Sequence, residues 1–544
     1  MARNPIPMMT HKFASYKEAS EKLTLKQKVG QLFMPAVFIN DSEEEVQQIE
    51  DLIRTHAIGA ICFFHSRASA ATNFEGKKKV VHNEHSYDRL KQLISRYQNA
   101  AQFPLLVAID AEWGLAMRIE NTYQYPYAIT LGAIQENSEL IFEVGRQIAL
   151  DCKKAGIHWN LAPVVDINDN PENPVIGYRS FGDDKNKVLS KSEAYLKGMK
   201  SVGVLNAIKH FPGHGDTATD SHLGLPVITK SKEDLLDNEL YPFAELIKQG
   251  VDAVMVGHLA VPALDDSENP ATTSSKIITN VLRKDLGFEG VIISDALNMH
   301  AVSKKFPEKG TLESTAFKAG MDVMCFSENV EEGIQQIIDS ACKERIDASF
   351  KRVWKLKEHA YTDADQQQST SPLSALNKTL AQQSITELYR DSLAVEQIKK
   401  SNFLNLSVDN QKENNFSVSV EKQYGQRHHP LELNSINKIR KLTAEYENIV
   451  LALFPPLVKP KNQFGFQSEI LDFINELSAQ KNVLTYLFGN PYVLDILELN
   501  PPSNVVVAFQ DFPEFQTEAI HHFNGQIEAK GKLPVKLKNY HEKV

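Results

Sequence analysis

The chain has 544 residues, of which 42% are hydrophobic and 24% are charged. This composition is typical of a folded protein with about two domains and excludes a disordered or fibrous chain. Acidic residues (69) outnumber basic ones (59), and the net charge of −10 excludes a basic surface for nucleic acid. No apolar run is long enough to span a bilayer, so we expect neither a nucleic-acid partner nor a membrane span.

The cysteines and the start of the chain predict a cytoplasmic protein. Cys62, Cys152, Cys325 and Cys342 form no CxxC pair or regular framework, which indicates a reducing compartment. The first twelve residues have no apolar segment typical of a signal peptide. A periplasmic or secreted location is the alternative if a signal peptide has been removed.

Eight short apolar runs alternate with longer helical or polar stretches over the first two thirds of the chain. The predicted strands are 31–37, 58–64, 105–110, 157–166, 204–210, 252–259, 290–295 and 321–326. Segments such as 138–155 and 232–249 have helical periodicity. This alternation predicts a (β/α)8 TIM-like barrel, with a doubly wound sheet as the alternative.

Polar residues at the ends of the predicted strands favour the barrel. They are Asp110, Asp166, Lys209, His210, His258 and Asp295. A charge at the end of a core strand costs burial energy unless it serves a site. In a barrel those ends meet on one face, where the active site lies.

A polar, glutamine- and serine-rich stretch marks the domain boundary. We expect a barrel domain over 1–361, a linker over 362–380, and a smaller α/β sandwich domain over 381–544. In the latter, 449–454, 483–488 and 505–510 are strand-like and 467–479 is helical. Few charges end these strands, which favours a structural or dimerising domain.

The loop after the fifth predicted strand concentrates titratable residues. Asp220 and His222 are two positions apart, so in an extended segment both side chains lie on one side, where a carboxylate can orient an imidazole for acid and base chemistry. A metal site is the alternative, because His210, His214, Asp216 and His222 are all ligand types. Their spacing matches no helix-borne ligand pair, and Pro212 with nearby glycines indicates a shaped loop.

Asp295 ends the apolar strand 290–295. A carboxylate fixed on a strand end is suited to attack an anomeric carbon and form a covalent intermediate. The alternative is an aspartate that caps the following helix.

Together these segments resemble glycoside hydrolase family 3, in its β-N-acetylhexosaminidase branch. The resemblance rests on the segments KHFPGHG (209–215), DSH (220–222) and SDALNM (294–299), and extends to DAE (110–112), NLAPVVD (160–166) and RSFG (179–182). Farther along, GNPY (489–492) and GKLPV (531–535) are similar to the family's C-terminal sandwich.

The resemblance implies a role for each matching residue. Asp295 is expected to be the nucleophile, and His222 with Asp220 the acid/base dyad. The residues expected to bind N-acetylglucosamine are Asp110, Arg118, Arg179, Lys209 and His210. It further implies a retaining exo-β-N-acetylglucosaminidase that acts on peptidoglycan-derived muropeptides and needs neither metal nor other cofactor.

The segment after Asp110 departs from the family's Asp-x-Glu-Gly-Gly-Arg pattern. Trp113 replaces a glycine and Leu115 replaces the nearer arginine, while Arg118 still falls at the binding position. Trp113 is expected either to pack against a sugar face or to fill the barrel mouth. Because of this departure, the resemblance does not predict which leaving group the neighbouring subsite prefers.

Three other functions remain to be distinguished. A β-glucosidase of the same family usually takes its acid/base from a glutamate in the second domain, whereas here the Asp220 and His222 dyad is intact. A phosphorylase would use the same residues with phosphate as acceptor, since a histidine repels phosphate less than a carboxylate does. A non-catalytic sugar-binding protein would lack the dyad or the nucleophile. The partner expected in each case is a small carbohydrate.

Overall fold

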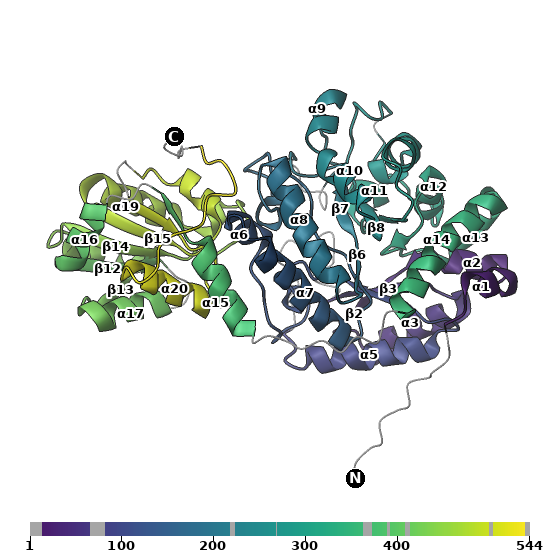
Figure 1. The fold of residues 1–544 in the computed structure, drawn as a ribbon, viewed down its shortest axis with the longest axis horizontal. Coiled ribbons are helices and arrows are strands. Elements are labelled where there is room, and N and C mark those ends of the chain that lie inside the picture. Colours follow the sequence, from purple (N-terminus) through teal and green to yellow (C-terminus); the bar gives the residue numbers. More distant parts are fainter. Residues whose placement is uncertain are drawn as a thin grey trace, which may run out of the picture.

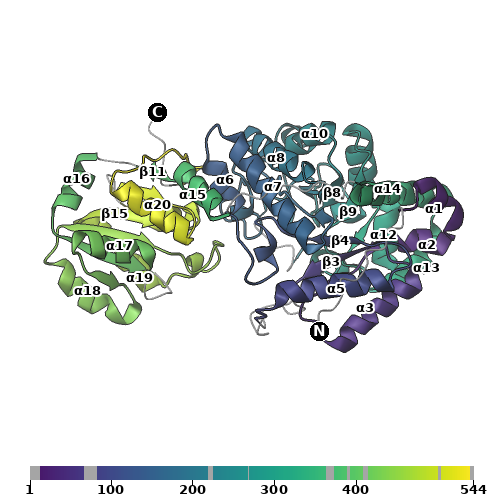
Figure 2. The same ribbon diagram turned by 60° about the horizontal axis from the view of Figure 1, so that its bottom comes forward.

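The computed structural model describes residues 13–65, 82–217, 224–267, 269–362, 373–388, 392–408, 414–499 and 504–538. Two domains lie side by side, with α6 (Ala128–Ala133) and α15 (Leu373–Ser384) at their junction (Figures 1 and 2). In the described part, no helix is long and apolar enough to cross a membrane.

The N-terminal domain is a parallel barrel, as predicted. Its strands are β1 (Phe33–Met34), β2 (Ala36–Phe38), β3 (Ala60–Phe64), β4 (Leu106–Ile109), β5 (Trp159–Asn160), β6 (Leu205–Asn206), β7 (Ile208–Phe211), β8 (Ala253–Val256), β9 (Val291–Ser294) and β10 (Met324–Cys325). Strands β2 to β6 pair in chain order, as do β7 to β9, and β1 pairs with β10. Bridges from Val164 to Lys209 and from Ile293 to Val323 join these sheets and complete the ring.

Helices cover the outside of the barrel (Figure 1). They are α1 (Tyr16–Lys22), α2 (Leu25–Gly30), α3 (Glu43–His56), α5 (Ser86–Ala100), α7 (Ser138–Ala155), α8 (Lys185–Lys200), α9 (Lys232–Asp237), α10 (Tyr241–Lys248), α11 (His300–Ser303), α12 (Thr311–Ala319), α13 (Val330–Ser340) and α14 (Lys343–Thr362). The domain also contains the ten-residue π-helix η4 (Lys276–Asp285) and the three-residue 3-10 turns η1 (Leu115–Met117), η2 (Gly177–Arg179) and η3 (Ala271–Thr273).

Helix α7 has the bounds that its periodicity predicts. The Asn137 side chain caps its first turn, and Gly156 ends it in a left-handed conformation. The predicted helix 232–249, in contrast, is divided into α9 and α10. Asn238 caps α9, and Pro242 occupies the first turn of α10, where a missing N–H costs nothing.

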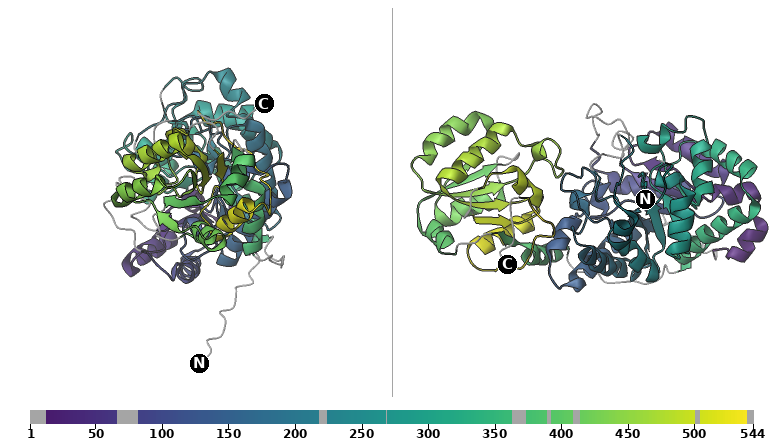
Figure 3. Two further views of the ribbon diagram at one scale, coloured as in Figure 1. Left: turned by 90° about the vertical axis from the view of Figure 1, so that its left-hand side faces the viewer. Right: turned by 90° about the horizontal axis from the view of Figure 1, so that it is seen from above.

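The C-terminal domain is a six-stranded sheet between helices (Figure 3). Its strands, in the order β11-β16-β15-β14-β12-β13, are β11 (Thr386–Leu388), β12 (Phe403–Val408), β13 (His428–Pro430), β14 (Asn448–Leu453), β15 (Asn482–Leu487) and β16 (Asn504–Val507). Its other helices are α16 (Ser392–Lys400), α17 (Asn415–Tyr424), α18 (Ile436–Thr443), α19 (Ser468–Gln480) and α20 (Pro513–Phe523), with the turns η5 (Leu433–Ser435), η6 (Gln463–Gly465) and η7 (Pro491–Ile496). All pairs are parallel except β11 with β16.

The apolar pattern predicted β14, β15 and β16 but not β11, β12 and β13. Helix α14 runs to Thr362, and α15 begins at Leu373, inside the predicted linker 362–380. Helix α15 packs against both α20 of the second domain and α6 of the first.

Hydrogen bonds fix the two domains against each other. The Lys532 amide donates to the Ala133 carbonyl (3.0 Å), and the Gln510 amide group donates to the Thr130 hydroxyl (2.7 Å). Closer to the mouth of the barrel, the Asn168 side chain donates to the Tyr492 hydroxyl (2.8 Å). The second domain is therefore anchored beside the face on which the barrel strands end.

Candidate active site

A cavity of about 350 Å³ opens at the carboxyl ends of the barrel strands. Its volume is within the range of small-molecule sites. The residues that line it are Phe64, Asp110, Trp113, Met117, Arg118, Leu161, Val175, Tyr178, Arg179, Lys209, His210, His214, Met255, Asp295, Ala296, Met299, Cys325 and Lys459. The predicted nucleophile and all five predicted sugar-binding residues are in this lining.

Asp110, just past the end of β4, is held between two cations. It accepts from the Lys209 ammonium at 2.8 Å and from the Arg118 guanidinium at 2.9 Å. Burial acts to raise the pKa of Asp110, but Lys209 and Arg118 outweigh it and hold that pKa below its ordinary value. Asp110 is therefore an ionised acceptor for sugar hydroxyls.

Glu112 completes this network, a role that the sequence analysis did not assign. Its carboxylate accepts from Arg179 through Nε (3.0 Å) and Nη2 (2.7 Å), and from Lys209 (2.8 Å). Burial opposes ionisation, but the two cations place the pKa of Glu112 far below its ordinary value. The same carboxylates outweigh burial of the Lys209 ammonium and raise its pKa. The available signal was the DAE segment, which already included Glu112.

Asp166 supports two histidines from beneath the cavity. Its carboxylate lies 2.7 Å from His210 Nδ1 and accepts from the His214 backbone amide at 2.8 Å. Although burial acts to raise it, the pKa of Asp166 is lowered, mainly by His210. With Nδ1 held by Asp166, the His210 ring is fixed beside Arg179, whose Nη2 lies 3.4 Å from His210 Nε2.

His214 is fully buried and electrically neutral at working pH. Its Nδ1 lies 2.8 Å from the Thr217 hydroxyl. Burial first, and the neighbouring His210 second, lower the pKa of His214 to about 4. This imidazole therefore serves the loop as a neutral hydrogen-bonding group.

Asp295 follows β9 and faces the same cavity. Its Oδ1 accepts from the next backbone amide, that of Ala296, at 2.7 Å, and its own amide donates to the Val256 carbonyl at 2.9 Å. The following helix α11 begins at His300 with Met299 as its N-cap residue. Asp295 therefore does not cap that helix, contrary to the alternative interpretation.

His258, also predicted at a strand end, is buried beneath the turn that carries Asp295. Its Nε2 lies 2.9 Å from the Ala296 carbonyl and its Nδ1 lies 2.6 Å from the Thr272 hydroxyl. His258 thus supports the backbone on one side of the carboxylate and does not line the cavity.

Asp220 and His222 lie outside the described residues. The described chain leads toward them through Gly213, whose φ of 120° favours glycine, and Gly215, where a side chain would meet the Ile167 carbonyl. Thr217 is anchored by the Asn173 amide group at 3.2 Å.

The metal interpretation receives no support from the described residues, among which no group of three or more His, Cys, Asp and Glu is arranged to hold an ion. The His210 and His214 ring centres are 5.9 Å apart. Asp216 lies 3.6 Å from the Lys230 ammonium. His222 falls outside the described residues.

Trp113 lines the cavity and also packs at the domain junction. Its ring is edge-on to Tyr127, with centroids 5.0 Å apart, and lies 5.8 Å from the Tyr178 ring. Trp113 therefore fills part of the barrel mouth and also forms part of the cavity wall.

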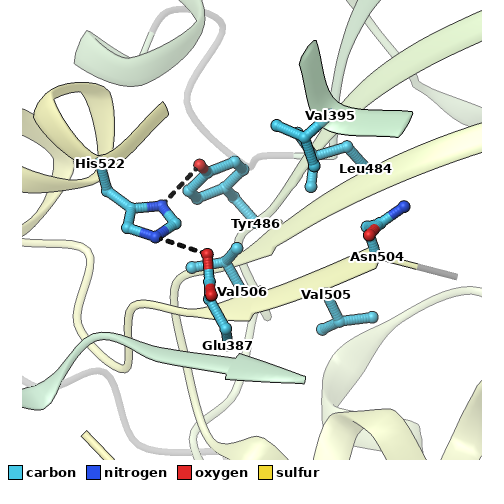
Figure 4. Close-up of a pocket in the computed structure, with 8 residues that line it drawn as sticks. All are labelled: Glu387, Val395, Leu484, Tyr486, Asn504, Val505, Val506 and His522. Atoms are coloured by element: carbon cyan, nitrogen blue, oxygen red, sulfur yellow. Dashed lines mark hydrogen bonds and ion pairs between the residues drawn. The ribbon is translucent and has the colours of Figure 1, made fainter. Parts of the chain in front are cut away.

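A polar group elsewhere superficially resembles a catalytic triad (Figure 4). In the C-terminal domain, His522 lies 2.9 Å from the Tyr486 hydroxyl and 2.9 Å from the Glu387 carboxylate. The adjoining cavity is only about 10 Å³, enough for one water molecule and not for a sugar.

Comparison with known proteins places this geometry in context. Residues 24–356 match the sequence profile of the glycosyl hydrolase family 3 N terminal domain. A protein named beta-hexosaminidase A from Pseudoalteromonas piscicida is 32% identical over 391 residues, which cover 66% of this chain and 62% of that protein. A beta-hexosaminidase from Tolumonas auensis is 36% identical over 47% of this chain and 76% of its own length.

A solved structure resembles nearly the whole chain. It is a glycoside hydrolase family 3 beta-N-acetylglucosaminidase from Paenibacillus sp. str. FPU-7, with a TM-score of 0.77 and 28% identity. The similarity covers 94% of this chain and 99% of that one, and so includes both domains.

Proposed function

Because this chain belongs to glycosyl hydrolase family 3, a family of glycoside hydrolases, we propose that it is a retaining exo-β-N-acetylglucosaminidase. It would remove terminal β-linked N-acetylglucosamine through a covalent glycosyl-enzyme intermediate. One observation carries the proposal: Asp295 and the paired charges around Asp110 and Glu112 line or adjoin a single cavity.

The paired charges suit a neutral, hydroxyl-rich ligand. Asp110 and Glu112 are ionised acceptors, and Lys209, Arg118 and Arg179 are donors whose charges they balance. A sugar can exchange hydrogen bonds with both kinds of group and bring no net charge into a buried site. Lys209 is only 1% exposed, so the donors and acceptors around it are shielded from bulk water, which strengthens their hydrogen bonds to a bound sugar.

In the proposed first step, an Asp295 carboxylate oxygen forms a bond to the anomeric carbon. The bond between that carbon and the leaving oxygen breaks, and His222 gives a proton to that oxygen. In the second step water attacks the anomeric carbon and gives a proton to His222, and the bond to Asp295 breaks. The configuration at the anomeric carbon is retained after the two displacements.

A histidine in the acid/base role suits this chemistry. Its ordinary pKa lies near neutrality, so it can both give and take a proton at working pH. It places less negative charge near the developing oxocarbenium ion than a second carboxylate would. Asp220 would orient the ring and hold its tautomer.

We further propose that the natural substrate is the terminal N-acetylglucosamine of peptidoglycan-derived muropeptides, processed in the cytoplasm. Support for the sugar comes from the beta-N-acetylglucosaminidase of Paenibacillus, to which both domains are similar. The muropeptide and the compartment follow from the resemblance and from the cysteine pattern.

The test is to incubate the protein with aryl β-N-acetylglucosaminide and aryl β-glucoside, with and without phosphate, and to identify the released sugar. Free N-acetylglucosamine with retained β configuration, observed by NMR before mutarotation, is the expected product. N-acetylglucosamine 1-phosphate would instead make the protein a phosphorylase, and glucose would make it a glucosidase. No release from either glycoside would favour a sugar-binding protein.

A further inference from the structure

Two cysteines from different barrel strands meet at the wall of the cavity. Cys325 in β10 lines the cavity, and its thiol forms a hydrogen bond with the thiol of Cys62 in β3. We propose that Cys62 and Cys325 form a binding site for a soft monovalent cation such as Cu(I), and that the bound ion inhibits the enzyme by excluding the sugar. The site does not depend on which sugar the enzyme removes.

The strand pairing places both cysteines on the inner face of the barrel. Met34 of β1 pairs with Cys325, and Ala36 of β2, two positions later, pairs with Cys62. Residues two apart on a strand point to the same face of the sheet, and Cys325 lines the cavity, so this face is the inner one. Alternate strands of a barrel contribute side chains to one layer of its interior. The two thiols therefore belong to one layer.

The same arrangement is unsuited to a disulfide. Because the segment 33–38 runs between β10 and β3, the backbones of the two cysteines are about 9–10 Å apart, twice the spacing of neighbouring strands. A disulfide needs Cα atoms within about 7 Å of each other. A direct sulfur–sulfur bond would pull the strands together, whereas an ion between the sulfur atoms can be accommodated by rotation of the side chains.

Sulfur ligands distinguish this pair from a site for hard cations. Thiolates and thioethers select ions such as Cu(I), whereas Mg²⁺ and Ca²⁺ prefer oxygen. Four residues that line the cavity contain sulfur, namely Met117, Met255, Met299 and Cys325. Structural zinc sites have four ligands, and in the part of the chain that the structure describes no group of three or more His, Cys, Asp and Glu is arranged to hold an ion. Two thiols therefore favour a soft ion that binds through two ligands.

The surroundings of Cys325 favour a bound cation over a free thiolate. The hydrogen bond with Cys62, then burial, and then the carboxylates of Asp110 and Asp295 raise the pKa of the Cys325 thiol well above its ordinary value. Electrophiles and oxidants attack thiolates, so they react slowly with a thiol of this kind. The negative charges that oppose the thiolate attract a cation.

Binding of one monovalent ion leaves the net charge of the site unchanged. One S–H bond breaks, its proton passes to solvent, and the electron pair of the resulting thiolate forms the first bond to the ion. A lone pair on the second sulfur, which keeps its proton, forms the other bond. The charge of the ion thus replaces the charge of the proton, and the pairing of Asp110 with Lys209 and Arg118 is undisturbed. A divalent ion would leave an additional charge in a buried site, which is costly.

Cys325 is also tied to the turn that carries Asp295. Its amide donates to the Ser294 hydroxyl at 2.9 Å, and its carbonyl accepts from the Leu297 amide at 3.0 Å. An ion on Cys325 therefore lies in the cavity that Asp295 lines, where it takes space and negative charge that the sugar requires. The ion and the sugar should exclude each other, so inhibition should be competitive.

The test uses silver nitrate in chloride-free buffer, because Ag(I) is soft and monovalent and does not change its oxidation state. Every sample is the full chain with Cys342→Ser, which removes the exposed thiol, and excess free methionine masks weak single-sulfur sites. Native mass spectrometry should count one tightly bound silver ion per chain. Silver should raise KM for an aryl β-N-acetylglucosaminide and leave kcat unchanged, and N-acetylglucosamine should weaken silver binding.

Single substitutions in this background identify the ligands. Cys62→Ser and Cys325→Ser should each weaken silver binding about 10²- to 10⁴-fold, because a two-point attachment becomes a one-point attachment. Cys152→Ser is the matched control, since Cys152 is also a fully buried thiol but lies on α7 and is absent from the cavity lining. It should bind silver as tightly as the background protein. Circular dichroism verifies each fold, and Cys62→Ala and Cys325→Ala replace any serine variant that does not fold.

Three results would overturn the inference. They are equal silver affinity in all three variants, a loss of affinity in Cys325→Ser without one in Cys62→Ser, and silver binding that N-acetylglucosamine leaves unchanged. Because mass spectrometry counts the ion without turnover, a protein that binds silver through both cysteines but cleaves no glycoside would contradict the proposed function alone.

Discussion

Replacing Glu112 by glutamine should impair catalysis through its pairing with Arg179 and Lys209. Glu112 accepts three charge-assisted hydrogen bonds, of 3.0, 2.7 and 2.8 Å. Glutamine keeps the shape, but it has one acceptor oxygen and turns an NH2 group toward a cation. Each lost charge-assisted bond is worth about 1.5–3 kcal/mol. If two are lost and part of the cost falls on the free enzyme, about 2–4 kcal/mol of transition-state stabilisation disappears.

This loss corresponds to a fall in kcat/KM of roughly 30- to 1,000-fold. The assay is steady-state hydrolysis of an aryl β-N-acetylglucosaminide, with circular dichroism to verify the fold. Glu143→Gln is the matched control, because Glu143 also forms a two-point pair, with Arg146 (2.7 and 2.7 Å), on α7 and away from the cavity lining. It should change kcat/KM by less than about twofold. A Glu112→Gln variant as active as this control would refute the reasoning.

Other changes probe the nucleophile, the acid/base residue and a buried cation. Asp295→Ala should abolish turnover while thermal unfolding shows an intact fold; a wild-type rate would contradict the nucleophile assignment. His222→Ala should cost about 10²- to 10⁴-fold with a poor leaving group and less in the first step with an activated aryl group; equal losses would argue against an acid role. Burial lowers the pKa of Lys357 to about 7, below its unfolded value, so its contribution to stability rises with pH from about 7 to about 10.5. Relative to Lys357→Met, the wild type should gain about 2.5 kcal/mol of unfolding free energy between about pH 7.5 and 9.5. If denaturation experiments give the same difference in unfolding free energy between the two proteins at both pH values, this linkage is excluded.

The alternation of apolar runs predicted the barrel because each barrel strand is buried and short, and each covering helix has one apolar face. The end of such a run also indicated which polar residues face the site, and Asp110, Lys209 and Asp295 all line the cavity. The apolar pattern predicted helix boundaries poorly where helical periodicity continued across a break between two helices. The predicted helix 232–249 is divided at Asn238, because capping and Pro242 favour two helices.

Strand β12 is as long as β14 and β15, but Asn405 and Ser407 interrupt its apolar run, and so it was not predicted. Strands β11 and β13 have three residues each, and their stability depends on the neighbouring strands. Residues 386–388 form an edge strand only by pairing with β16, more than a hundred residues later. Short segments of this kind have no periodic signal long enough to identify them. Their assignment therefore required the folded sheet.

The amino-acid sequence by itself determined the barrel class, the family and the strand-end residues, because these depend on local patterns and on short motifs. The pairing of Glu112 with Arg179, 67 positions apart, and the arrival of Lys459 from the second domain depend on how the barrel closes and how the domains dock. Such contacts are set by the packing of distant elements, which leaves no spacing rule in the chain, and so only the tertiary structure decided them.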